Sequence, residues 1–114
     1  MSSAYLGRVL EWLDNDRAAL ANIVAKFLDD CPAKLGNIRE ALTAGDASRL
    51  ASAARNFRGT LMLFEACESI GLTDRLEELA KRRDFGAAAR VAGALEDAAR
   101  RLGEDLSNEA ATPR

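Results

Sequence analysis

The stretch that decides the fold is residues 16–44, DRAALANIVAKFLDDCPAKLGNIREALTA. Its apolar residues recur every three or four positions, which is the spacing of one face of an α-helix. They are Leu20, Ile23, Val24, Phe27, Leu28, Cys31, Leu35, Ile38 and Leu42. Pro32 removes a helical hydrogen bond and clashes with the preceding turn, yet the apolar series continues in phase beyond it. We therefore expect one long, kinked helix rather than two unrelated ones.

The same spacing extends through most of the chain on either side. Upstream, the apolar residues between Tyr5 and Leu13 follow the same spacing, which predicts a short N-terminal helix. Downstream, glycine and aspartate at 45–46 end one helix and cap the next, so a third helix should run from there to about Phe64 or Ala66. Two more helices are predicted at about 67–82, with apolar residues at 70, 72, 76 and 79, and at about 85–106, after Asp84 as a cap. Residues 107–114 are small and polar, and we expect a flexible C-terminal tail.

Helices of these lengths joined by short connections favour antiparallel neighbours. The predicted fold is all-α: an antiparallel up-down-up-down four-helix bundle with a short extra N-terminal helix, formed by residues 1–106. In the third helix the inward face would consist of Leu50, Ala53 or Ala54, Phe57, Leu61 and Phe64. The opposite face would present Ser52, Arg55, Asn56, Arg58, Gly59 and Met62.

Composition excludes several classes of function. The chain has 114 residues, a formal net charge of −2 and no histidine, so it does not suggest a nucleic-acid binder. No run approaches the roughly 20 apolar residues that cross a bilayer, and we expect a cytoplasmic protein without a membrane partner. Cys31 and Cys67 are expected to be reduced thiols and make a poor zinc site without histidine. The serines lack a histidine partner for a triad. We expect no metal, no cofactor and no enzymatic activity.

A glycine inside the third helix needs an explanation, because glycine costs up to about 1 kcal/mol relative to alanine there. Gly59 lies one turn beyond Arg55 and next to Arg58, so the three residues predict a flat, cationic and sterically open strip. One interpretation is that another molecule approaches the backbone at Gly59. The other is that a neighbouring helix packs closely against it. Spacing alone leaves both open.

The stretch ARNFRGT at 54–60 also belongs to a wider pattern. Four other segments accompany it: FLDDCP at 27–32, ALTAGD at 41–46, Leu76-Glu77, and RDF at 83–85. In order and spacing they resemble histidine-containing phosphotransfer (HPt) domains, whose signature reads roughly Ala-His-x-Leu-Lys-Gly-Ser. The resemblance covers nearly the whole chain up to Leu106. It implies a helical bundle that docks the receiver domains of response regulators or sensor kinases.

Three residues depart from the family's pattern. Arg55 stands where the family carries its phosphorylated histidine, and the chain has no other imidazole. A guanidinium stays protonated at physiological pH and is a very poor nucleophile. Met62 and Glu65 stand where the family usually has small residues or glycine. The resemblance therefore implies a docking surface that has lost the chemistry of phosphoryl relay.

Together these observations predict a pseudo-phosphotransfer domain of two-component signalling. It would bind a receiver domain or sensor kinase through Ser52, Arg55, Asn56, Arg58, Gly59 and Met62 without carrying phosphate. Arg55 could engage the receiver's carboxylates with its bidentate fork, or it could be a solvated residue without a role. Two alternatives remain: a helical interaction adaptor unrelated to phosphorelay, and an HPt domain whose histidine was mutated.

Overall fold

A computed structural model describes residues 16–64 and 66–111, and within them every regular element is an α-helix. The helices are α2 (Arg17–Ala44), α3 (Ala47–Met62), α4 (Cys67–Lys81) and α5 (Phe85–Ala111). The described part of the chain contains no strand, so the predicted all-α class is confirmed. The helix expected at Tyr5 to Leu13 and the departure at Glu65 lie outside the described residues.

Helix α2 is a single element across Pro32, as the uninterrupted apolar series predicts. At its start the Asp16 carboxylate accepts a hydrogen bond from the backbone N–H of Ala19 at 3.1 Å. Pro32 itself is exposed, while residues on both sides of it, Phe27 and Ile38, are buried in the core. Burial of one continuous face therefore outweighs the hydrogen bond that the proline removes.

The helix ends differ from the expected ones in two places. Helix α3 ends at Met62, and a tighter turn follows in which the Phe64 N–H donates to the Leu61 carbonyl at 3.1 Å. Helix α5 continues past Leu106 to Ala111, so residues 107–111 belong to the helix rather than to a tail. Nothing in the sequence stops α5 earlier, because no glycine or proline occurs between Gly103 and Pro113.

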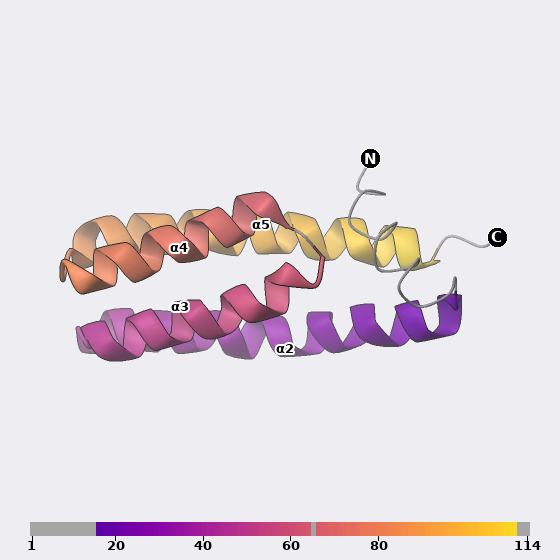
Figure 1. Ribbon diagram of the computed structural model, residues 1–114, viewed down its shortest axis with the longest axis horizontal. Helices are drawn as coiled ribbons and strands as arrows, with labels where there is room; N and C mark the ends of the chain where they lie inside the picture. The colour runs from indigo at the N-terminus through magenta and orange to yellow at the C-terminus, as the bar shows by residue number, and fades with distance from the viewer. Residues whose placement is uncertain (1–15, 65, 112–114) are drawn as a thin grey trace.

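Each helix packs against two others, α3 against α2 and α4, and α5 against α4 and α2. Figure 1 shows the four helices lying lengthwise beside one another, with α2 and α5 extending beyond α3 and α4 at one end. This arrangement is compatible with a four-helix bundle. None of the described helices combines the length and the apolar character needed to cross a bilayer.

The core between the helices consists of aliphatic and aromatic side chains. Phe27 of α2 and Phe64 meet edge to face, with ring centroids 5.3 Å apart. Helix α4 also buries two polar residues, Ser69 and Thr73, beside Leu76 and Leu79. The Thr73 hydroxyl donates to the Ile70 carbonyl at 2.7 Å, so its burial does not leave that donor unsatisfied.

Candidate functional site

The predicted faces of α3 are confirmed. The inward residues Leu50, Ala54, Phe57, Leu61 and Phe64 are fully buried. Between the two alanines left open by the sequence, the structure buries Ala54 and leaves Ala53 half-buried. On the other side Ser52, Arg55, Asn56, Gly59 and Met62 are exposed and Arg58 is half-buried. We call these six residues the Arg55 face.

Arg55 is paired rather than freely solvated. Its Nε and Nη2 atoms donate to one oxygen of Glu77 on α4, Oε2, at 3.2 and 3.0 Å. The Arg55 side chain is 60% exposed and that of Glu77 only 21%. The Glu77 side chain is thus largely covered, and the Arg55 side chain lies at the surface. An exposed pair of this kind contributes about 0–1 kcal/mol to stability.

Arg58, one turn further along α3, makes a second ion pair between α3 and α4. Its Nε lies 2.7 Å from Oδ1 of Asp74, in an ion pair without hydrogen-bond alignment. Its Nη1 donates to the sulfur of Met62 at 3.3 Å. Arg58 lies three residues after Arg55 on α3, and its partner Asp74 lies three residues before Glu77 on α4, so the two ion pairs follow each other along the helix contact. Two carboxylates of α4 balance the two guanidinium groups, so the strip is not the unopposed cationic surface that its own residues predict.

Asn56 connects the Arg55 face to the helix on its other side. Lys34 of α2 donates from Nζ to Oδ1 of Asn56 at 2.6 Å. The face is therefore bordered by α4 on one edge and by α2 on the other. Polar contacts from both neighbours fix side chains of α3 in place without burying them.

The surroundings of Gly59 decide between the two interpretations of this glycine. A Cβ built at Gly59 would meet nothing within 4 Å, so close packing of a neighbouring helix does not require the glycine. The same openness is found at Gly36 and Gly71, and openness alone therefore does not single out Gly59. What distinguishes Gly59 is its position one turn from Arg55 on an exposed helix face.

An apolar hollow begins at Gly59 and runs between α3 and α2. It has a volume of about 410 Å³ and is lined by Ile23, Lys26, Phe27, Asp30, Gly59, Thr60, Leu63 and Phe64. Its lining residue Leu63 is 39% exposed, and the preceding residue in the sequence, Met62, is 51% exposed. A second hollow of about 680 Å³ lies between α2 and α5, where Leu28 is exposed. Contiguous apolar patches at the surface are typical of interaction sites, whereas single exposed apolar side chains are ordinary.

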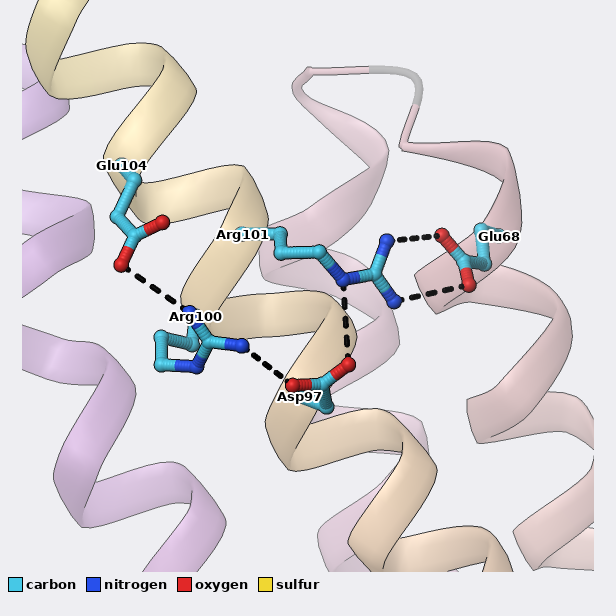
Figure 2. Close-up of polar contacts among 5 residues, drawn as sticks. All are labelled: Glu68, Asp97, Arg100, Arg101 and Glu104. Carbon is cyan, nitrogen blue, oxygen red and sulfur yellow. Dashed lines mark hydrogen bonds and ion pairs between the residues drawn. The ribbon is translucent and has the colours of Figure 1, made fainter.

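Glu68 of α4 and four charged residues of α5 form a second network, separate from the contacts of Arg55. Figure 2 shows Arg101 of α5 reaching Glu68 of α4, with both Nη atoms 3.3 Å from its carboxylate oxygens. Asp97 lies between Arg100 and Arg101 and accepts hydrogen bonds from both. Hydrogen bonds from Arg100, then Arg101, hold the pKa of the Asp97 carboxyl below its usual value. This network joins two helices and gathers no reactive groups.

The six residues of the Arg55 face include the Ser52 hydroxyl but no imidazole and no thiol. The cysteine thiols lie elsewhere, and burial raises the pKa of the Cys31 thiol. Sequence reasoning placed the residues of α3 but missed Asp74 and Lys34 as their partners. Glu77 was visible only as part of the Leu76-Glu77 pair. The surface can present a guanidinium, an open backbone segment and a thioether to another molecule.

Comparisons of the chain with protein-family models, curated proteins and solved structures gave no match.

Proposed function

We propose that the chain is a pseudo-phosphotransfer domain, which binds a receiver domain or a sensor kinase and carries no phosphate. The observation that supports this most directly is the position of Arg55. It stands where the resemblance puts the phosphoacceptor, on an exposed helix face beside an open glycine. In this proposal the four helices form the up-down-up-down bundle of that family, and the protein acts in the cytoplasm.

The chemistry of the Arg55 face fits the carboxylate cluster of a receiver active site. A guanidinium can hold a carboxylate through two parallel hydrogen bonds. Met62, half exposed one turn beyond Gly59, adds a flexible apolar contact of the kind found at adaptable surfaces. Docking would compete with or sequester a relay component, because the face has no histidine to take the phosphoryl group from the receiver.

The test is binding to a panel of purified receiver domains, with and without beryllofluoride as a phosphoryl analogue. We expect at least one receiver to bind, and Arg55→Ala to weaken that binding about tenfold or more. Arg82→Ala is the matched control, because Arg82 is also an exposed arginine paired with a glutamate, Glu78. Binding that is equal in both variants would leave Arg55 without a role.

The rival function is a helical adaptor whose partner has no connection to phosphorelay. The paired state of Arg55 and Arg58 favours it, because arginines in surface ion pairs need no partner to explain them. Affinity capture separates the two: the adaptor hypothesis predicts that no receiver binds and that the captured protein is indifferent to Arg55→Ala.

A further inference from the structure

The contact between Arg55 and Glu77 has two unequal sides. The Glu77 side chain is 21% exposed and the Arg55 side chain 60%, so Glu77 is the more covered partner. A molecule approaching the Arg55 face therefore meets more of the Arg55 side chain than of its acidic partner. The ion pair between Arg58 and Asp74 differs, because there the carboxylate residue, Asp74, is the more exposed partner.

Within residues 16–64 and 66–111, the contacts of the Arg55 guanidinium lie on one edge. Glu77 Oε2 accepts from Nε and Nη2. Among the residues that the structure describes, no carboxylate meets the other edge, formed by Nη1 and Nη2. Guanidinium is a planar fork with five donors, so this outer edge can take a second carboxylate while the inner edge keeps the first.

We propose that Glu77 sets the affinity of the Arg55 face for an acidic partner, by sharing Arg55 with the partner's carboxylate and repelling it. This inference rests on the proposed function for the identity of the partner, a receiver with clustered carboxylates. Arg55, Arg58, Asp74 and Glu77 sum to no net charge. Lys34, which contacts Asn56, adds one positive charge at the border of the face. At Arg55 itself, attraction comes from one guanidinium edge, and the carboxylate of Glu77 opposes it.

Glu77→Gln separates the two effects of this residue. The amide oxygen can still accept from Nε and hold the guanidinium in place, while the negative charge is gone. Glu78→Gln is the matched control. It removes the same charge from the neighbouring position of α4, where the carboxylate pairs with Arg82 instead.

The experiment uses the full chain and a small acidic probe, acetyl-Asp-Asp-amide, at low ionic strength. Nuclear magnetic resonance follows the Arg55 Nε–H signal and the Gly59 backbone amide during titration. We expect the dissociation constant of the probe to fall about threefold or more in Glu77→Gln, and to stay within about 1.5-fold of wild type in Glu78→Gln. Arg55→Ala should abolish the response at Gly59.

Equal behaviour of Glu77→Gln and Glu78→Gln would overturn the proposal, as would weaker binding in Glu77→Gln or no response in any variant. Because the probe is not a receiver, this result is separate from the receiver panel. A panel without binders, combined with tighter probe binding in Glu77→Gln, would reject the proposed function and leave the role of Glu77 in place.

Discussion

Gly45 and Arg83 occupy equivalent left-handed positions, with φ of 64° and 56°, each one residue before an aspartate that caps the following helix. Both N–H groups donate to the carbonyl three residues back, Leu42 and Ala80 respectively, at 3.1 and 3.0 Å. The turn between α2 and α3 and the turn between α4 and α5 therefore share one geometry. Glycine adopts it without strain, whereas arginine carries a Cβ that crowds the carbonyl.

Replacing Arg83 with glycine should therefore stabilise the protein. Relief of the left-handed strain contributes about 1 kcal/mol, part of which is offset by the added freedom of the unfolded chain and by loss of the contact with the Phe85 ring. We expect a net gain of about 0.5 kcal/mol in the free energy of unfolding, measured in urea.

The adjacent residue, Arg82, provides a control in which glycine should change the free energy of unfolding in the opposite direction. Arg82 is right-handed, with φ −86°, and pairs with Glu78. Arg82→Gly should lower the free energy of unfolding by about 0.5–1 kcal/mol. If both variants lose stability, strain at Arg83 is not the dominant effect.

The sequence predicts which residues of one helix face inward, and the structure explains why it predicts less about neighbouring helices. Leu50, Phe57 and Leu61 follow the helical period, because that period alone decides which side of α3 is buried. The pairing of Arg58 with Asp74 depends on the register between two helices, which no local pattern contains. The burial of Thr73 is not predicted for another reason. Its hydroxyl donates to a carbonyl of its own helix, so this polar residue can occupy a buried position.

Gly59→Ala should separate stability from binding. Its methyl group would enter open space, so helix propensity should raise the free energy of unfolding by about 0.5–1 kcal/mol. The same methyl group would stand where a partner approaches the backbone, and we expect receiver binding to weaken about tenfold. Urea denaturation and the binding panel measure the two effects on one sample.

Gly86→Ala is the control for this prediction. Gly86 is exposed in the first turn of α5 and has no residue of the Arg55 face near its Cβ position. The Gly86→Ala variant should gain stability and bind the receiver as tightly as the wild-type protein does. A Gly59→Ala protein that binds as tightly as wild type would show that no partner uses this backbone segment.

Stability should fall in acid partly through Glu96. Arg39 of α2 donates from Nε and Nη2 to the two oxygens of Glu96 on α5 at 2.7 and 2.8 Å, and this hydrogen bonding holds the pKa of the Glu96 carboxyl below its usual value of 4.5. A carboxyl whose folded pKa is lowered stabilises the fold above its unfolded pKa, and this contribution is lost as the pH falls through the folded value.

Glu96→Gln should therefore cost stability at pH 7 and reduce the further loss in acid. Both side chains are more than a third exposed, so screening limits the cost at pH 7 to about 0.5–1 kcal/mol. Urea denaturation at a series of pH values from neutral to below 4.5 measures it. An acid limb as steep in the variant as in wild type would assign the pH dependence to other carboxyls, such as Asp97.

The resemblance at Arg55 makes the most demanding prediction. Arg55→His would place an imidazole on an exposed helix face, one turn from open backbone at Gly59. A neutral imidazole carries one unprotonated nitrogen, which can attack a phosphoryl group. We expect the variant to take phosphate from a receiver that binds the wild-type chain, as an acid-labile modification at position 55 found by mass spectrometry. Arg58→His, with the same residue change one turn away, should stay unmodified. An Arg55→His protein that still binds the receiver but never becomes phosphorylated would mean that the surface lacks the geometry of a phosphotransfer site.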